Sequence, residues 1–191
     1  QGAAASGAEV VVVLGGDGTL NEAANGLAGS NCALAALPGG STNVFARTIG
    51  LPNDPIEATS DLLDALARDA IRPVGLGNVN GRYFLFHTGV GFDAAIVAQV
   101  EKRSGLKRYA GHALFIYAGI ETTLAHYDRS QSHFSVHHAD GSVVPDGYMT
   151  VVLNTNPYTY LGNRPFNLAP DPGFDRGLAV VIISHNLHDI F

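Results

Sequence analysis

The sequence is poor in cysteine, in positive charge and in long apolar runs. Its 191 residues include one cysteine, Cys32, so they offer neither a disulfide framework nor a cluster of thiolate metal ligands. The formal net charge of −6 argues against the basic surface with which proteins bind nucleic acids. The sequence contains no apolar run of about 18 residues and no signal-peptide pattern. These absences favour a cytoplasmic protein that neither binds nucleic acid nor spans a membrane.

Apolar residues and glycine, in contrast, are abundant. Hydrophobic residues make up 46% of the chain, which is enough to bury a core and to build one or two domains. Several of the 23 glycines gather in two short segments, each between an apolar run and a helical pattern. These two segments carry the functional signal of the sequence.

The first segment, EVVVVLGGDGTLNEAANGL, predicts a strand, a glycine turn and a helix. Residues 10–14 are β-branched or bulky without polar alternation, as in a strand buried on both faces of a parallel sheet. From Leu20 onward the apolar residues recur with the spacing of one helix face. Thr19 and Glu22 fit a capping box at the helix start, and Gly29 suits the helix stop.

This turn is a candidate anion site. The first amides of a helix have no partner inside the helix, and an anion can accept their hydrogen bonds. Gly15, Gly16 and Gly18 lack a Cβ, so a ligand can approach the backbone closely. The alternative is an ordinary tight turn. Asp17 favours a ligand, because a carboxylate beside a phosphate implies Mg²⁺, a sugar hydroxyl, or a base facing an acceptor hydroxyl.

The second segment, CALAALPGGSTNVFARTIG, repeats the construction. An apolar strand over 32–37 runs into the turn Pro38-Gly39-Gly40, a hydroxyl cap at Ser41 or Thr42, and a helix closed by Gly50. Two consecutive units of this kind predict parallel strands joined by a right-handed crossover, with both glycine turns at one sheet edge.

The helix after the second turn adds two candidate polar contacts. Asn43 and Arg47 are four residues apart, so they share a helix face near the predicted sheet edge. Arg47 is a candidate auxiliary cation for a bound phosphate. A cation at this position also fits a solvated helix surface, and the sequence leaves both interpretations open.

Together, GGDGTLNE and LPGGSTNVFAR resemble the catalytic region of the diacylglycerol kinase family, which includes bacterial lipid kinases and the ceramide and sphingosine kinases. GNVNGRYFLFHTGVGFDAAIV and RPFNLAPDPGFDRGL follow in the same order as in that family. The resemblance implies an α/β plus β-rich chain, with a partial Rossmann-like parallel α/β nucleotide domain over residues 1–72. An antiparallel β-sandwich-like domain with inserted helices would follow over residues 73–191. Further parts of both domains are expected outside this chain.

The resemblance implies a lipid kinase that transfers the γ-phosphoryl group of ATP to the hydroxyl of diacylglycerol or a similar lipid alcohol. Exposed helix termini stabilise an anion by only about 0.3 to 1 kcal/mol, so we expect Mg²⁺ besides ATP, with Asp17 as its partner or as a catalytic base. The family's first and second motifs imply nucleotide contacts from Gly16, Asp17, Gly18, Thr19, Asn21, Glu22 and Thr42. The turn chemistry adds Gly15, Gly39, Gly40, Ser41, Asn43 and Arg47.

Two positions depart from the family pattern. Val44 stands where the family usually has Asp after the Asn of the second motif. The family's turn associated with a structural Mg²⁺ is here Asp175-Arg176-Gly177, so Asp175 is the candidate ligand and Arg176 replaces an acid. The family's proposed catalytic Glu would lie beyond Phe191, and we therefore expect this chain alone to be inactive.

The remaining elements are mostly predicted strands. Asn80-Gly81 is a type I′ hairpin signal, and Asp140-Gly141 marks a second hairpin. The predicted strands are 74–79, 82–88, 133–138, 147–155 and 178–184, and the predicted helices are 55–69, 93–103 and 109–125.

A basic cluster offers a candidate membrane contact. Lys102, Arg103, Lys107 and Arg108 lie within one short segment, which fits either a solvated helix end or peripheral binding to an anionic bilayer. The sequence leaves the oligomeric state open, a dimer included.

Three alternative functions compete with the lipid kinase. An NAD kinase shares GGDGT, although the second motif and the later segments fit lipid kinases better. A non-catalytic nucleotide- or lipid-binding module gains weight from Val44 and Arg176. A dinucleotide dehydrogenase is disfavoured, because the first turn lacks G-x-G-x-x-G.

Overall fold

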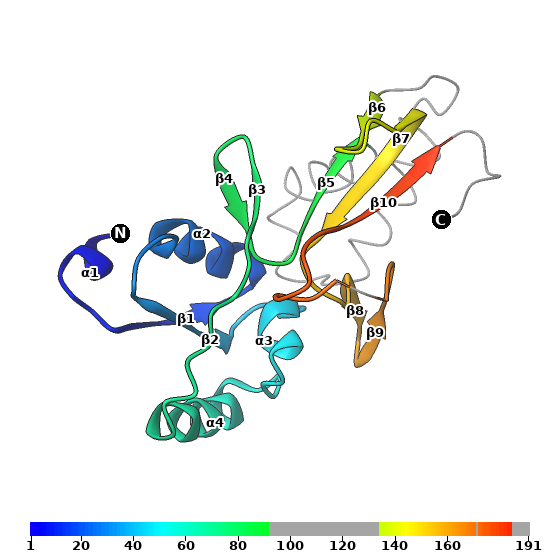
Figure 1. Ribbon diagram of the computed structural model, residues 1–191. Helices are drawn as coiled ribbons and strands as arrows, with labels where there is room; N and C mark the ends of the chain where they lie inside the picture. The colour runs from blue at the N-terminus through cyan, green and yellow to red at the C-terminus, as the bar shows by residue number, and fades with distance from the viewer. Residues whose placement is uncertain (92–133, 171, 185–191) are drawn as a thin grey trace, which may run out of the picture. The chain divides into compact units, whose positions relative to one another are not determined.

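The computed structural model of the chain describes residues 1–91, 134–170 and 172–184 (Figure 1). Contacts divide the chain into two compact units, one of residues 1–87 and 153–179 and the other of residues 88–152 and 180–191. The first unit therefore includes residues that follow the predicted boundary at 72, because later segments return to pack with the first ones. The domain assignment itself stays a prediction.

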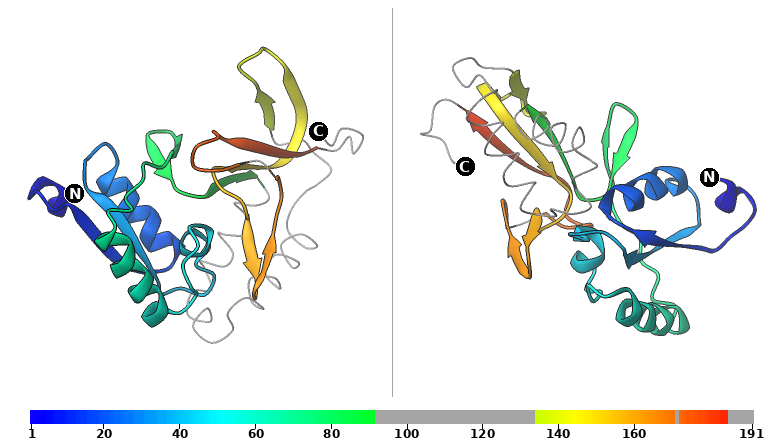
Figure 2. Two further views of the ribbon diagram at one scale, coloured as in Figure 1. Left: turned by 60° about the horizontal axis from the view of Figure 1, so that its bottom comes forward. Right: turned by 180° about the vertical axis from the view of Figure 1, so that it is seen from behind.

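A parallel strand pair with helices on both sides forms the start of the first unit. After the short helix α1 (Gly2–Ala5), β1 (Val10–Gly15) pairs in parallel with β2 (Ala33–Pro38), as the sequence predicts. Helix α2 (Asp17–Leu27) packs on both strands and α4 (Pro55–Ala67) packs on β2. Figures 1 and 2 show α2 and α4 on opposite sides of the strand pair.

Both predicted helix starts needed correction. No side chain caps α2, because its N-cap is Gly16 and Thr19 already lies inside the helix, so the capping box is wrong. The short helix α3 (Val44–Thr48) has Asn43 as its N-cap, in the left-handed conformation with φ of 53°, rather than Ser41 or Thr42. The stop signals were right: Gly29 and Gly50 follow α2 and α3 with φ of 77° and 89°.

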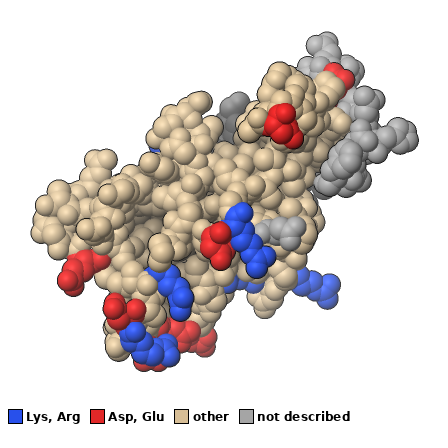
Figure 3. Space-filling model, in the orientation of Figure 1, with Lys and Arg blue, Asp and Glu red and all other residues tan. Residues whose placement is uncertain are grey.

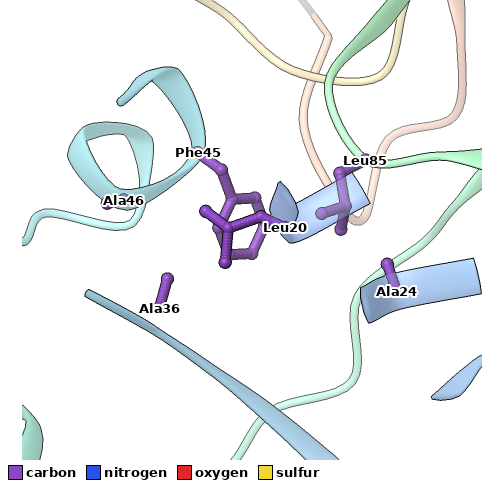
Figure 4. Packing of buried hydrophobic residues seen from close by; sticks show 6 residues of the cluster. All are labelled: Leu20, Ala24, Ala36, Phe45, Ala46 and Leu85. Atoms are coloured by element: carbon purple, nitrogen blue, oxygen red, sulfur yellow. The ribbon is translucent and has the colours of Figure 1, made fainter. Parts of the chain in front are cut away.

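The core of the first unit collects small and large apolar side chains from distant segments. Leu20 and Ala46 are fully buried, and the segment after β4 (Arg82–Phe84) contributes Leu85. Figure 4 shows how these side chains converge, and the cluster comprises Leu20, Ala24, Ala36, Phe45, Ala46 and Leu85. Burying such side chains supplies most of the free energy that holds α2 and α3 on the strand pair.

Two hairpins complete the first unit. β3 (Gly77–Val79) and β4 pair in antiparallel fashion around Asn80 and Gly81, whose φ angles of 50° and 80° confirm the predicted type I′ turn. β8 (Thr159–Leu161) and β9 (Arg164–Phe166) form the other hairpin.

A four-stranded sheet contains most of the described residues of the second unit. It comprises β5 (His87–Gly91), β6 (Phe134–His137), β7 (Val143–Leu153) and β10 (Ala179–Ser184), with β7 hydrogen-bonded to the other three strands. The predicted hairpin at Asp140-Gly141 is confirmed, since β6 and β7 pair in antiparallel fashion around it. The helices predicted over 93–103 and 109–125 lie outside the described residues. The mixed class of helices and sheets is thus confirmed, whereas the Rossmann-like and sandwich descriptions stay predictions.

Candidate functional site

The two glycine turns lie side by side at the carboxyl ends of the parallel strands. The register pairs Gly15 at the end of β1 with Pro38 at the end of β2. The next amide continues this pairing, because Gly39 N–H donates to Gly15 O over 3.0 Å. The predicted meeting of both turns at one sheet edge is confirmed, and this edge is where ligands bind in open α/β sheets.

Close backbone contact explains most of the glycines in these turns. A Cβ on Gly40 would lie 2.6 Å from Gly16 Cα, and a Cβ on Gly39 would lie 2.9 Å from Gly15 N. Neither approach leaves room for a side chain. These glycines therefore allow one turn to pack on the other, a use that the sequence analysis did not foresee.

Gly18 is different, because a Cβ there would meet nothing within 4 Å. It lies in the first turn of α2, where the Leu20 N–H makes a helical bond to Gly16 O over 3.1 Å. The amides of Asp17, Gly18 and Thr19 precede that bond, so they are the unpaired donors of the helix start. An anion bound here would face open space beside Gly18.

Asn43 shapes the second turn from the inside. Its side chain is 3% exposed, accepts the Gly40 N–H at Oδ1 over 2.8 Å and donates from Nδ2 to Gly40 O over 3.0 Å. Nδ2 also donates to Asn53 Oδ1 over 2.7 Å. The buried amide is thereby satisfied within the protein, and Asn53 is a supporting residue that no local pattern indicated.

Asp17 joins the two strand-turn-helix units. It is half-buried at the start of α2, and its Oδ1 accepts the backbone N–H of Phe45 in the first turn of α3 over 3.0 Å. This bond supplies α3 with the carboxylate cap that its own N-cap does not provide. The neighbouring Val44 is buried. Asp17 thus has a structural contact besides the catalytic and metal-binding roles that stay predictions.

The next polar residues of α2 hold the β4 segment. Asn21 Oδ1 accepts the Leu85 N–H over 3.0 Å. Asn25 forms two bonds with the backbone of Tyr83, accepting its N–H over 2.9 Å and donating to its carbonyl over 2.8 Å. Residues 17, 21 and 25 share one helix face, since they recur every four positions. Asn25 could have been found from that spacing.

Glu22, another predicted nucleotide contact, is exposed and forms an ion pair with Arg82 of β4. Asn21 and Glu22 therefore bind the protein itself, and their nucleotide contacts stay predictions. Thr19 and Ser41 are exposed near their turns, and Thr42 is half-buried.

Arg47 reaches the β8–β9 hairpin. Its guanidinium carbon lies 3.5 Å from the centre of the Tyr160 ring, and Nη1 donates to Gly162 O over 3.0 Å. The Thr42 carbonyl lies at the limit of a hydrogen bond from the same Nη1, at 3.5 Å. Arg47 is thus half-buried against protein groups and is more than a solvated surface cation.

Asp17 fits Mg²⁺ in its donor chemistry. Its second carboxylate oxygen has no hydrogen-bond partner among the described residues, and Mg²⁺ bound with nucleotide phosphates commonly takes one or two carboxylates. Asp175 is exposed in the turn between Gly173 and Gly177. The described residues contain no group of three or more His, Cys, Asp or Glu side chains placed to hold a metal. Metal binding by Asp175 stays a prediction.

His87 is a feature that the sequence analysis missed. Its ring packs between Phe86 and Tyr158, with ring centroids 5.0 Å and 4.5 Å away. Burial lowers the pKa of His87 to about 4, so the imidazole is neutral at physiological pH. Its Nδ1 is buried with no hydrogen-bond partner among the described residues.

The predicted membrane contact stays a prediction, because the described residues do not test it. The predicted basic cluster of Lys102, Arg103, Lys107 and Arg108 lies outside them. In the part of the chain that the structure describes, no helix is long and apolar enough to cross a bilayer. Figure 3 shows Arg side chains interspersed with Asp and Glu side chains on the face in view.

Comparison with known proteins supports the predicted relationship. Residues 1–79 match the family model described as "Diacylglycerol kinase catalytic domain". The chain is 38% identical to "Probable lipid kinase YegS-like" of Pseudomonas aeruginosa (strain PAO1) over 135 residues, which are 70% of this chain and 42% of that protein. It is 34% identical to "Diacylglycerol kinase" of Bacillus subtilis (strain 168) over 115 residues, or 59% of this chain and 36% of that one.

A solved structure agrees with these sequence matches. The crystal structure of a diacylglycerol kinase from Bacillus anthracis str. Sterne superposes with a TM-score of 0.64 and 30% sequence identity. The superposition covers 95% of this chain and 56% of that one. This chain thus spans less than two thirds of the length of the relatives that it matches.

Proposed function

We propose that this chain, which is related to the diacylglycerol kinase catalytic-domain family, belongs to an ATP-dependent lipid kinase. The reaction would move the γ-phosphoryl group of ATP to the hydroxyl of diacylglycerol or a similar lipid alcohol. The observation that carries the proposal is the pair of glycine turns in backbone contact at one sheet edge, beside the open helix start at Gly18.

In this proposal, the α2 start binds the ATP phosphates. The amides of Asp17, Gly18 and Thr19 would donate to phosphate oxygens, and the absent side chain of Gly18 leaves the space for them. The turn at Gly39 and Gly40 would hold the first turn in place through its contacts with Gly15 and Gly16. A preformed set of donors accelerates phosphoryl transfer mainly by positioning and electrostatic stabilisation.

Asp17 would hold Mg²⁺ through the carboxylate oxygen that Phe45 does not use. When bound, Mg²⁺ neutralises charge on the phosphates, which the helix start alone does too weakly. The Phe45 amide fixes the carboxylate in one orientation, so the free oxygen is presented in a defined direction. The sequence offers no Walker-type lysine near the first turn to share this work.

Arg47 would act by placing the β8–β9 hairpin rather than as a direct cation for ATP. Its guanidinium is already stacked on Tyr160 and bonded to Gly162. A guanidinium that left these partners for a phosphate would lose both contacts. We therefore assign Arg47 a positioning role in the same reaction.

The finer expectations are part of the proposal. The protein would be cytoplasmic and bind membranes peripherally, with Lys102, Arg103, Lys107 and Arg108 contacting anionic lipid. Val44 and Arg176, which replace family acids, are the observations that favour a binding module without turnover.

The decisive experiment compares acceptors with γ-labelled ATP and the natural protein that contains this chain. At least one of the lipids diacylglycerol, ceramide and sphingosine, presented in mixed micelles, should gain the label. NAD should remain unlabelled. Label in NADP would instead support an NAD kinase. ATP binding without transfer to any acceptor would support the binding module.

A further inference from the structure

The β8–β9 hairpin has two faces of different character. Directly opposed residues of an antiparallel pair place their side chains on the same face, and successive residues alternate. Tyr160 is opposed to Pro165, so both lie on one face. The stacking of Arg47 on Tyr160 and its bond to Gly162 fix this face against α3.

The opposite face is apolar, cationic and exposed. The opposed pairs Thr159 with Phe166 and Leu161 with Arg164 lie on it. Leu161 is 49% exposed and Phe166 is 43% exposed, and Arg164 is exposed as well. Figure 2 shows β8 and β9 as a hairpin in both views. We call Leu161, Arg164 and Phe166 the outer hairpin face.

The hairpin lies within one of the stretches of the chain that contain no acidic residue. The chain has 17 acidic residues and a net charge of −6, yet residues 147–170 contain no Asp or Glu. Arg164 is thus the one charged side chain in that stretch, and it forms no ion pair among the described residues. Arg164 would attract an anionic surface, and no carboxylate within residues 147–170 would repel it.

This combination is that of an interfacial membrane contact. Leu and Phe side chains bury their apolar atoms at the boundary between headgroups and acyl chains, while a nearby cation binds anionic headgroups. A phenyl ring and a branched aliphatic chain beside an arginine match both layers of that boundary.

We propose that the outer hairpin face binds an anionic phospholipid surface and that Arg47 holds the hairpin in position for that contact. The inference rests on the proposed function, since a lipid kinase must meet its acceptor at a membrane. It adds a binding surface made of described residues, separate in sequence from the basic cluster at 102–108.

Co-sedimentation with vesicles tests this surface. The natural protein that contains this chain, without substitutions, is the parent. It should bind vesicles of phosphatidylcholine mixed with phosphatidylglycerol, and it should bind vesicles of phosphatidylcholine alone more weakly. Arg164→Gln should reduce binding to the anionic vesicles about fivefold and leave binding to phosphatidylcholine unchanged. Leu161→Gln with Phe166→Gln should reduce binding to both kinds of vesicle by at least about tenfold.

A matched control uses exposed apolar residues elsewhere. Ile56 and Leu63 of α4 are 82% and 61% exposed, so Ile56→Gln with Leu63→Gln removes as much exposed apolar surface without touching the hairpin. This control should bind vesicles like the parent. Equal losses in control and hairpin variants would overturn the proposal, because binding would then follow general hydrophobicity.

The positioning role of Arg47 is tested on the other face. Tyr160→Leu removes the ring under the guanidinium and should weaken vesicle binding, although every residue of the outer hairpin face remains. Tyr160→Phe keeps the ring and should retain more vesicle binding than Tyr160→Leu. Identical binding by Tyr160→Leu and the parent, with native circular dichroism in both, would refute the positioning role.

Other outcomes separate this inference from the proposed function. Loss of vesicle binding in the hairpin variants, while no lipid is phosphorylated by the parent, would sink the proposed function and keep the surface. If the parent phosphorylates lipid and the hairpin variants still bind vesicles normally, the proposed function would stand and the proposed surface would be overturned. If the hairpin variants differ from the parent in sedimentation coefficient but not in vesicle binding, the outer hairpin face would instead bind a second copy of the chain. That result would overturn the proposal.

Discussion

Gly40→Ala should lower the free energy of unfolding, whereas Gly18→Ala should keep or raise it. The reason is that Gly40 packs against Gly16, while a Cβ on Gly18 would meet nothing within 4 Å. The added Cβ on Gly40 would lie 2.6 Å from Gly16 Cα. Carbon atoms rest about 3.5 to 4.0 Å apart, so the two turns must separate by about 1 Å. That shift would break the bond from Gly39 N–H to Gly15 O.

Losing that bond costs about 0.5 to 1.5 kcal/mol, and overpacking adds about 1 to 3 kcal/mol. We therefore expect Gly40→Ala to lower the free energy of unfolding by about 2 to 4 kcal/mol. Gly18→Ala meets nothing within 4 Å and lies inside α2, where alanine is favoured over glycine by about 1 kcal/mol. Its unfolding free energy should equal or exceed that of the parent.

Nucleotide affinity should move differently from stability. The methyl group of Gly18→Ala would occupy the space in which a phosphate meets the α2 amides, and the loss of one charge-assisted hydrogen bond costs about 1.5 to 3 kcal/mol. ATP affinity should therefore fall by at least about tenfold in a protein that is fully folded.

Urea denaturation followed by circular dichroism and calorimetric titration with ATP measure the two effects. A Gly40→Ala protein as stable as the parent would show that the two turns are not in contact. A Gly18→Ala protein that binds ATP like the parent would refute phosphate binding at the start of α2.

Three further predictions concern the polar residues. In the natural protein that contains this chain, Asp17→Asn keeps an oxygen for the Phe45 amide and should keep the fold, but lipid kinase turnover should fall by at least about a hundredfold; near-normal turnover would remove Asp17 from the mechanism. His87 has a pKa of about 4 in the folded protein, against 6.5 for a solvent-exposed histidine, so the unfolded chain takes up the proton first as the pH falls. Unfolding free energy should therefore drop by up to about 3 kcal/mol between pH 6.5 and 4, and His87→Leu should remove this part of the pH dependence. If parent and variant showed the same profile, the burial of the imidazole would be in doubt. Asn25→Ala removes the acceptor of the Tyr83 N–H and leaves the Tyr83 carbonyl only the longer bond from Asn21 Nδ2, which should cost about 1 to 3 kcal/mol and speed hydrogen exchange of the Tyr83 amide; unchanged exchange would contradict the contact.

Local patterns predicted the elements around the site well. The apolar runs that became β1 and β2 and the glycines that follow them are short-range signals, and Asn80-Gly81 specifies its turn through two residues with positive φ. Parallel pairing followed from two successive strand-turn-helix units. Each of these inferences needs only neighbours along the chain.

The contacts between elements were not predictable in the same way. The bond from Leu85 N–H to Asn21 spans 64 positions, and that from Arg47 to Gly162 spans 115. Such pairs leave no periodicity in the sequence, so Asn21 was interpreted as a ligand contact and Arg47 as a surface or phosphate-binding cation. The glycines were likewise assigned to ligand approach, because a contact between Gly16 and Gly40 exists only after the strands have paired.

The most direct test of the account is an amide NMR titration of the chain with ATP. Phosphate binding at the start of α2 predicts that the amide resonances of Gly18 and Thr19 shift most strongly with ATP and scarcely with adenosine, which has no phosphate. The Gly39 amide is already bonded to Gly15 O and should move much less. Unchanged Gly18 and Thr19 resonances at ATP concentrations that shift amides elsewhere in the chain would contradict the proposed nucleotide site.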